Sequence, residues 1–131
     1  MSAIENVVII GSGPAGLTAA LYLARAELCP LVLAGSTPGG QLMLTGEVEN
    51  YPGFPDGIGG PELIDRMIKQ AERFGARLLY ENATKVEARK QPFMVATQSK
   101  RYRTRSVILS TGSATRWLGV PGEQELIGKG V

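Results

Sequence analysis

Histidine is absent from this 131-residue sequence, and cysteine occurs once, at Cys29. Histidine is the commonest general base and metal ligand in proteins, so its absence removes the usual residue for acid–base catalysis and for metal binding. A single cysteine cannot form an internal disulfide, which is compatible with a reducing compartment. Because Cys29 lies between an expected helix and Pro30, we interpret it as a small packing residue rather than a nucleophile. We expect no catalytic residue and no metal site in these residues.

A strong net charge is also lacking, since 14 Lys and Arg residues face 12 Asp and Glu residues and leave +2. This balance cannot build the electrostatic surface of a nucleic-acid-binding protein. One local basic run, residues 100–105, reads Lys-Arg-Tyr-Arg-Thr-Arg. We interpret it as a solvated hairpin edge whose charges discourage aggregation, with a binding patch as the alternative.

The one long uncharged run, residues 7–24, is not a convincing membrane span or signal peptide. No Lys or Arg precedes it, so the basic region of a signal peptide is missing. Gly11, Gly13 and Pro14 also divide it into two short apolar pieces. We therefore expect a soluble, cytoplasmic protein with no membrane partner.

The first part of the sequence predicts a β-α-β unit. Residues 6–10 form a β-branched run that ends at Gly11, the pattern of a buried parallel strand. Residues 15–27 are rich in Ala and Leu at helical spacing, and residues 31–34 read as a second strand. Such a crossover places its two strands parallel in one sheet.

The rest of the sequence extends this sheet. Residues 35–60 form a long loop rich in Gly and Pro, and interleaved apolar residues favour an ordered loop over a flexible linker. The remaining expected elements are an amphipathic helix at 61–74, a strand at 77–81, a hairpin excursion at 84–89 and 93–97, and a buried strand at 106–110. The predicted fold is α/β and Rossmann-like, with three layers formed by helices, a parallel sheet and an antiparallel β excursion.

Residues 11–16 read Gly-Ser-Gly-Pro-Ala-Gly and match the dinucleotide fingerprint, between a predicted strand and a predicted helix. The first Gly permits the turn, the second lets a pyrophosphate approach, and the third allows close packing of helix and strand. A glycine-rich turn without a ligand is the alternative. The acid that usually ends the second strand and binds the ribose is missing, because Ala34 and Gly35 stand there.

Two further motifs lie in the long loop, where residues 39–42 read Gly-Gly-Gln-Leu and residues 46–55 read Gly-Glu-Val-Glu-Asn-Tyr-Pro-Gly-Phe-Pro. They resemble the FAD loop of the low-molecular-weight thioredoxin reductases, and the resemblance to that family covers essentially the whole chain. Residues 110–113 (Ser-Thr-Gly-Ser) resemble its second turn beside the flavin, with Ser110 in place of the usual Ala and its hydroxyl expected near the flavin. The stretch that follows also matches at Arg116, Leu118 and residues 120–123.

The resemblance implies FAD as cofactor, NADPH as electron donor of the full-length protein, thioredoxin or a similar small redox protein as partner, and a homodimer. Gln41 and Asn50 are then expected to hydrogen-bond the flavin side, and the backbone of Ala83 to line the adenine pocket. The complete set of residues expected to bind the cofactor is Gly11, Ser12, Gly13, Pro14, Ala15, Gly16, Ala34, Gly35, Gly40, Gln41, Leu42, Asn50, Ala83, Thr111 and Gly112.

The same resemblance implies that residues 1–131 are the first segment of a discontinuous FAD-binding domain. In this family, the equivalent of residues 128–131 is soon followed by a Cys-x-x-Cys pair, an NADPH domain and a C-terminal FAD segment. A disulfide reductase needs a dithiol couple, which Cys29 alone cannot form. We therefore expect this chain alone to be inactive as a thioredoxin reductase.

Three other interpretations remain open. The first is a related flavoprotein, such as a peroxiredoxin reductase or a ferredoxin–NADP reductase of similar form. The second is a non-catalytic flavin- or nucleotide-binding module, which is disfavoured because we expect the hydrophobic faces of the sheet to lack a covering segment. The third is a plain NAD-linked dehydrogenase, which is disfavoured by Ala34 and by the long loop.

Overall fold

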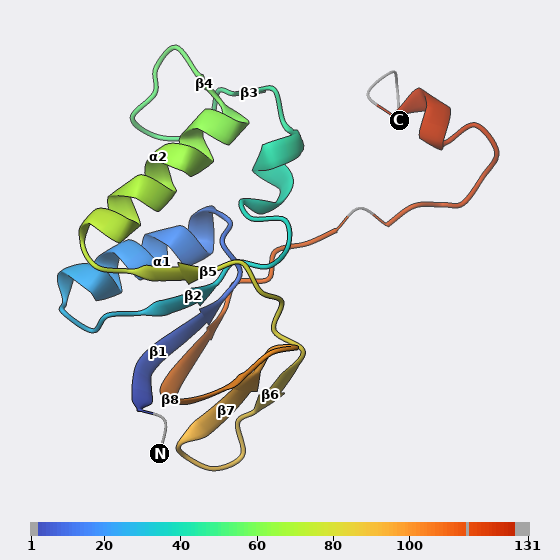
Figure 1. The fold of residues 1–131 in the computed structure, drawn as a ribbon. Coiled ribbons are helices and arrows are strands. Elements are labelled where there is room, and N and C mark those ends of the chain that lie inside the picture. Colours follow the sequence, from blue (N-terminus) through green and yellow to red (C-terminus); the bar gives the residue numbers. More distant parts are fainter. Residues whose placement is uncertain (1–2, 115, 128–131) are drawn as a thin grey trace.

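The computed structural model describes residues 3–114 and 116–127, and its elements follow one another as shown in Figure 1. Residues 128–131, expected to lead toward a Cys-x-x-Cys pair, lie outside the described residues. The elements are β1 (Ile4–Ile10), α1 (Pro14–Arg25), β2 (Leu31–Leu33), η1 (Gly40–Leu44), β3 (Glu47–Val48), β4 (Ile58–Gly59), α2 (Gly60–Arg73), β5 (Arg77–Leu79), β6 (Lys85–Glu87), β7 (Phe93–Ala96), β8 (Arg101–Leu109) and η2 (Gln124–Leu126).

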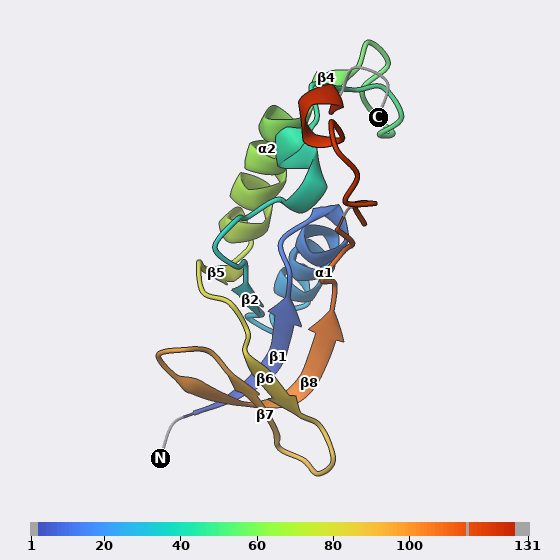
Figure 2. The same cartoon turned by 90° about the vertical axis from the view of Figure 1, so that its right-hand side faces the viewer.

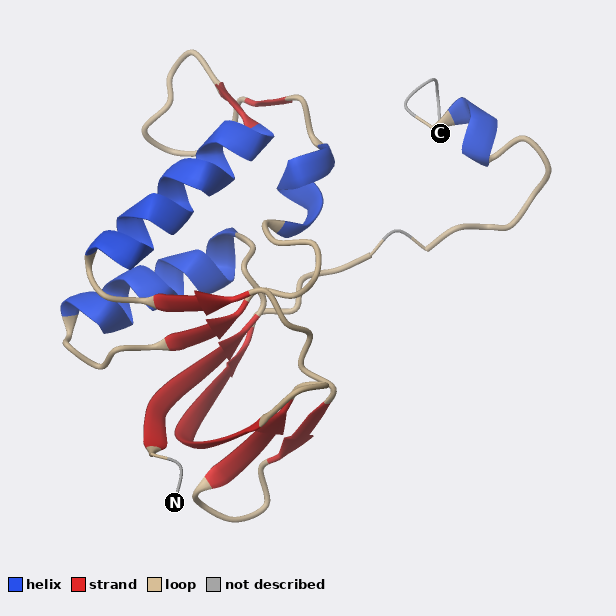
Figure 3. Ribbon diagram, viewed as in Figure 1, coloured by secondary structure: helices blue, strands red, loops and turns tan. Residues whose placement is uncertain are grey.

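The main sheet has six strands in the order β5-β2-β1-β8-β7-β6 (Figure 3). Strands β5, β2, β1 and β8 are parallel to one another, whereas β7 pairs antiparallel with both β8 and β6. The predicted α/β fold, with its parallel sheet and antiparallel excursion, is therefore confirmed. A second, small sheet pairs β3 with β4 inside the long loop, so that loop is ordered as predicted.

Helices α1 and α2 cover one face of the parallel sheet (Figure 1). Side chains of β1 and β2 that point to this face meet small residues of both helices, so the helices can approach closely. The buried residues of this layer are Val7, Ile9, Ala20, Ala24, Val32, Ala71 and Ala76.

The antiparallel excursion packs against the face of the parallel strands that α1 and α2 leave free (Figure 2). Alternate side chains of β1 and β2 point this way, because successive residues of a strand face opposite sides. The buried residues of this layer are Val8, Ile10, Leu31, Leu33, Val95 and Tyr102. The expectation that the faces of the sheet lack cover is therefore wrong for these strands, since the excursion buries the face that the helices leave free.

Residues 101–105 of the basic run form the first half of β8. The interpretation of this run as a hairpin edge is wrong, because β8 has a neighbouring strand on each side. The run does form a hairpin with β7 as predicted, but from Arg103 onward it pairs with β1 on its other side. Tyr102 and Thr104 are buried, whereas Arg101 and Arg105 are exposed. The charges are solvated because they alternate with buried residues, although the strand is internal.

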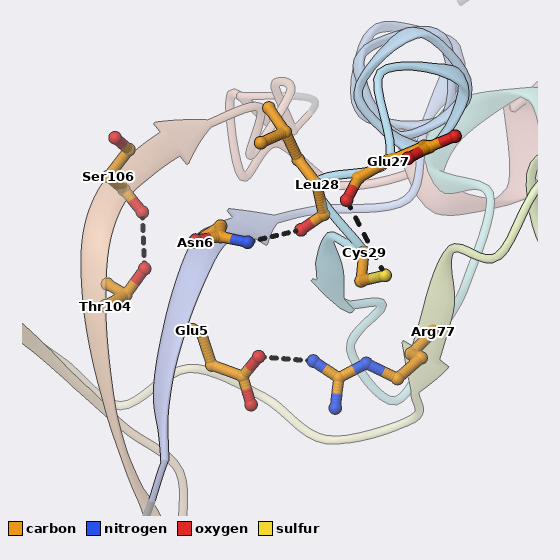
Figure 4. A network of polar contacts seen from close by, with 8 residues as sticks. All are labelled: Glu5, Asn6, Glu27, Leu28, Cys29, Arg77, Thr104 and Ser106. Carbon is orange, nitrogen blue, oxygen red and sulfur yellow. Dashed lines mark hydrogen bonds and ion pairs between the residues drawn. The ribbon is translucent and has the colours of Figure 1, made fainter.

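Cys29 is exposed and does not serve as a packing residue, which corrects our interpretation of it. It lies just before β2, in a turn where Glu27 and Cys29 have φ values of +60° and +46°. This turn belongs to a polar network at the amino ends of the strands, where Asn6 Nδ2 donates to Leu28 O at 3.2 Å and Glu5 pairs with Arg77 (Figure 4). Cys29 therefore lies at the sheet edge opposite the glycine turn, which follows the carboxyl end of β1.

After β8 the chain leaves the sheet and runs outward to η2 (Figure 1). The carboxylate of Glu123 holds this segment in a local turn, accepting hydrogen bonds from the Leu118 and Gly119 amides at 2.7 Å each. Among residues 3–114 and 116–127, no helix has the length and apolar character needed to cross a membrane.

Candidate cofactor-binding site

The glycine turn joins the carboxyl ends of three neighbouring strands. The Gly11 amide donates to Leu33 O of β2, and the Ser110 amide, just after β8, donates to Ile10 O, each at 2.9 Å. Gly11 has a φ of +108°, and a Cβ atom there would lie 2.2 Å from the Ser110 carbonyl oxygen. Only glycine fits at this crossing, where the chain turns from β1 toward α1.

The other two glycines of the motif differ in their surroundings. A Cβ atom on Gly16 would lie 2.1 Å from the Gly11 carbonyl oxygen, so Gly16 is required for the close contact between α1 and the turn. A Cβ atom on Gly13 would meet nothing closer than the Gly39 carbonyl oxygen at 4.0 Å. The space beside Gly13 is open, and its φ of −68° would admit any residue, so neither packing nor backbone conformation requires glycine here. This open side is where a ligand can approach the backbone.

The amino end of α1 opens onto this space. Gly13 is the N-cap and makes no side-chain cap, Pro14 occupies the first turn, and that turn carries no acid. The amides of Ala15 and Gly16 belong to the first turn, whose N–H groups have no partner within a helix. Uncapped amides and the positive end of the helix dipole attract phosphate. The residues present therefore fit the pyrophosphate of a dinucleotide.

Ser12 has a structural task inside the turn. It is 3% exposed, and its hydroxyl donates to Ala34 O at 2.9 Å while accepting from the Gly39 amide at 3.1 Å. These bonds fasten the glycine turn to the end of β2 and to the start of η1. Any contact of Ser12 with a cofactor is therefore left to its backbone.

Helix η1 brings the second glycine pair to the same place. Gly39 is buried, and a Cβ atom there would lie 2.6 Å from Met43, whereas Gly40 has open space around it. Gln41 Nε2 donates to Ser113 O at 3.3 Å, so η1 is tied to the segment after β8. Leu42 is partly buried against a cluster formed by Val48, Ile58 and Leu63. The structure thus brings residues 11–16, 39–42 and 110–113 close together.

The carboxyl ends of β2 and β5 form the next part of the edge. The amides of Ala34 and Gly35 donate to Leu79 O at 2.8 Å and to Glu81 O at 3.2 Å. Ala83 lies partly buried against the sheet. Ala34 and Gly35 therefore lie directly after β2 and bond to the end of β5, whereas Ala83 lies in the connection between β5 and β6.

Glu81 is the acid of this strand end, but its carboxylate is engaged elsewhere. The hydroxyls of Thr97 and Ser99, and then Lys100, hold the pKa of Glu81 below its ordinary value against a smaller opposing effect of burial. Ser99 Oγ donates to Glu81 Oε2 at 2.8 Å. Glu81 therefore does not replace the ribose-binding carboxylate that is missing at the Ala34 position.

Asn50, Thr111 and Gly112 are placed less closely. Asn50 is exposed in a shallow hollow formed by residues 49–55, and no hydrogen bond within the described ranges joins it to residues 11–16. Thr111 and Gly112 are exposed just after β8, and Gly112 has a φ of +67° with open space around it. Thr111 and Gly112 lie between Ser110, which contacts the glycine turn, and Ser113, which accepts from Gln41, whereas Asn50 lies within its own loop.

The sequence singled out Ser110, whose hydroxyl was expected near the flavin, but not the partners of that hydroxyl. Ser110 Oγ donates to Ile10 O at 2.9 Å, with Gly11 O at 3.2 Å, so its hydroxyl points into the glycine turn. Sequence reasoning missed Asn82, which binds Ser36 across the ends of β2 and β5. Neither Asn82 nor Ser36 belongs to a recognisable motif.

These features define a dinucleotide-binding α/β domain of the Rossmann type. The sequence matches the model of the pyridine nucleotide-disulphide oxidoreductases over residues 5–131, and the chain belongs to that family. It is 56% identical over 129 residues to the bifunctional thioredoxin reductase/thioredoxin of Mycobacterium leprae. It is 55% identical over 133 residues to the thioredoxin reductase of Streptomyces coelicolor.

Solved structures agree with these matches. The thioredoxin reductase of Lactococcus lactis superposes with a TM-score of 0.84 at 43% identity, covering 95% of this chain and 41% of that one. The two sequence relatives align with 98% and 100% of this chain. The chain spans only 28% and 41% of their lengths.

Proposed function

We propose that this chain is the FAD-binding part of an NADPH-dependent flavoprotein disulfide reductase that reduces thioredoxin. The carrying observation is the open backbone at Gly13 and Gly40 beside the uncapped amino end of α1. Relatives named thioredoxin reductase, at 55% identity or more over nearly the whole chain, support the assignment. FAD, when bound, supplies a flavin ring that passes electrons between a hydride donor and a disulfide.

In this proposal the chain's own residues bind and orient the cofactor. The amides at the start of α1 hold the pyrophosphate, and Gly13 keeps the approach free of side chains. Gln41, Thr111 and Gly112 face the flavin side, together with Asn50 from its loop. Ala34, Gly35 and Ala83 meet the adenosine side, because the ribose of a bound dinucleotide lies at the end of the second strand.

The proposal extends to the whole protein of which these residues are a part. Residues 1–131 form the first segment of a discontinuous FAD-binding domain, and an NADPH domain and a C-terminal FAD segment belong to the complete enzyme. The same assignment implies that the complete enzyme reduces thioredoxin or a similar small redox protein, forms a homodimer and lies in the cytoplasm. An NAD-linked dehydrogenase is disfavoured because Ala34 supplies no carboxylate for the ribose.

FAD binding by the 131-residue chain tests the proposal, with Gly13→Ala as the diagnostic variant. The new methyl group has room in the protein, so the fold is retained, but it occupies the space reserved for the pyrophosphate. We expect FAD affinity, measured by flavin fluorescence titration, to fall about tenfold or more, equivalent to about 1.4 kcal/mol.

Gly59→Ala is the matched control, because Gly59 is the N-cap of α2 with a φ of −59°, and a Cβ atom there would meet nothing closer than 3.9 Å. It should bind FAD like the unaltered chain. Equal FAD affinity in the Gly13→Ala and Gly59→Ala variants, or no FAD binding by the unaltered chain, would contradict the proposed site.

A further inference from the structure

Ser36 and Asn82 form a reciprocal pair at the carboxyl edge of the sheet. The Ser36 amide donates to Asn82 Oδ1 at 3.1 Å, and Asn82 Nδ2 donates to Ser36 Oγ at 3.2 Å, across 46 residues of sequence. Both residues are exposed, so this pair lies at the surface, next to the carboxyl ends of β2 and β5. We call these two residues the clasp.

The clasp fixes the backbone that follows β2. Gly35 lies between the two strand ends with a φ of +79°, and a Cβ atom there would lie 3.1 Å from Asn82 Oδ1. The Gly35 amide donates to Glu81 O, directly before Asn82. The turn after β2 is therefore held against the turn after β5 by backbone and side-chain bonds together.

The clasp also occupies a position where a dinucleotide-binding protein commonly has a carboxylate. The acid at the end of the second strand normally binds the ribose hydroxyls. Here Ala34 has no polar side chain, and the Glu81 carboxylate is bound to Ser99. The polar side-chain groups that the clasp presents at this edge are a neutral amide and a hydroxyl.

We propose that Asn82 is a positioning residue for the adenosine half of the cofactor and that the clasp replaces the missing carboxylate. Asn82 holds Ser36 and the Gly35 backbone in the conformation that meets the ribose. The Ser36 hydroxyl accepts from Asn82 and keeps its own proton free to donate to a ribose oxygen. This inference rests on the proposed FAD-binding function.

Three ligands separate a positioning role from a purely structural one. FAD and ADP both carry the adenosine half, whereas FMN carries only the flavin half with one phosphate. We expect Asn82→Ala to lower the affinity of the full chain for FAD and for ADP by roughly fivefold to tenfold. Without Asn82, the Ser36 hydroxyl is no longer held in place, and its hydrogen bond to the ribose is lost. FMN affinity and the thermal unfolding midpoint should remain unchanged.

Two further variants sharpen the test. Ser36→Ala removes the hydroxyl and should reproduce the loss for FAD and ADP, even if Asn82→Ala folds poorly. Gln98→Ala truncates another exposed amide side chain, in the β7–β8 turn, and should leave all three affinities unaltered.

The possible outcomes distinguish the clasp from the site as a whole. If the unaltered chain binds FAD but both clasp variants bind it within twofold as tightly, the clasp proposal is wrong and the proposed function stands. If FMN affinity falls in parallel with ADP affinity, the pair is only structural. If the unaltered chain binds neither FAD nor ADP, both proposals fail.

Discussion

At the scale of single residues, one motif contains glycines with different tasks. Gly11 and Gly16 are required by the protein itself, since a Cβ atom on either would lie within 2.2 Å of a carbonyl oxygen. Gly13 has room for a side chain and therefore has no such structural need. Stability and ligand binding are thus separable within three residues of one turn.

Substitution of Gly16 by Ala tests this separation. We expect the free energy of unfolding to fall by about 1–3 kcal/mol, the usual cost of forcing a methyl group into a packed contact. Urea denaturation measures the change, and Gly13→Ala should stay within about 0.5 kcal/mol of the unaltered chain. Equal stability of the two variants would show that the contact between α1 and the glycine turn relaxes freely.

The roles of some of these residues could be predicted from the sequence, whereas the roles of others could not. The glycine motif was visible because its spacing and its place between strand and helix depend only on neighbouring residues. The Ser36–Asn82 clasp was invisible, because its two members lie 46 residues apart and meet only when β2 and β5 pair. Cys29 was misjudged because its exposure depends on the turn with positive φ that precedes β2.

At the scale of elements, the hairpin of β6 and β7 is a covering layer of the sheet. Val95 of β7 is fully buried against residues of β1 and β2, whereas its cross-strand partner Val86 of β6 is 38% exposed. The two valines have the same side chain and neighbouring positions, but only Val95 lies within the central core. The hairpin is therefore part of the cooperative fold rather than an appendage.

Valine-to-alanine substitutions at these two positions test that view. We expect Val95→Ala to lower the free energy of unfolding by about 2 kcal/mol, because two buried methyl groups and their contacts are lost. Val86→Ala should cost less than about half as much. Denaturation followed by both far-ultraviolet circular dichroism and tyrosine fluorescence should give one coincident transition, and separate transitions would show that the hairpin unfolds alone.

Element boundaries could be predicted where the pattern was local. The two helices and the strands of the β-α-β unit were predicted to within a few residues, because apolar periodicity and glycine signals mark them. Strand β8 was predicted too short, although Tyr102 and Thr104 alternate with arginines in the period of a strand. Its second partner, β1, lies at the other end of the sequence, so no local pattern showed that β8 is internal.

At the scale of the whole molecule, the positions of the cysteine and of the cofactor site limit what the chain can do. Cys29 lies just before β2, at the amino edge of the strands (Figure 4), whereas the glycine turn follows β1 at the carboxyl edge. A disulfide reductase needs a pair of thiols near the flavin, and these residues hold one thiol at the far edge.

We therefore expect the 131-residue chain, saturated with FAD, to show no thioredoxin-dependent oxidation of NADPH. Loss of NADPH absorbance measures turnover, and a complete thioredoxin reductase from a relative serves as the positive control. Sustained NADPH consumption that requires both the chain and thioredoxin would contradict the expectation.

The pairing of β1 with β8 also affects how the protein is made. The register joins Ile10 to Leu109, so β1 receives its second neighbour from β8, which comes last in the described sequence among the strands of this sheet. Proteins dominated by such distant pairings fold slowly, and a ribosome adds about 5–20 residues each second. Until Leu109 has been synthesised, β1 has an unpaired edge that can join another strand. The parallel part of this sheet is therefore complete only after β8 has been translated, and the free edge of β1 is most exposed to mispairing before that point.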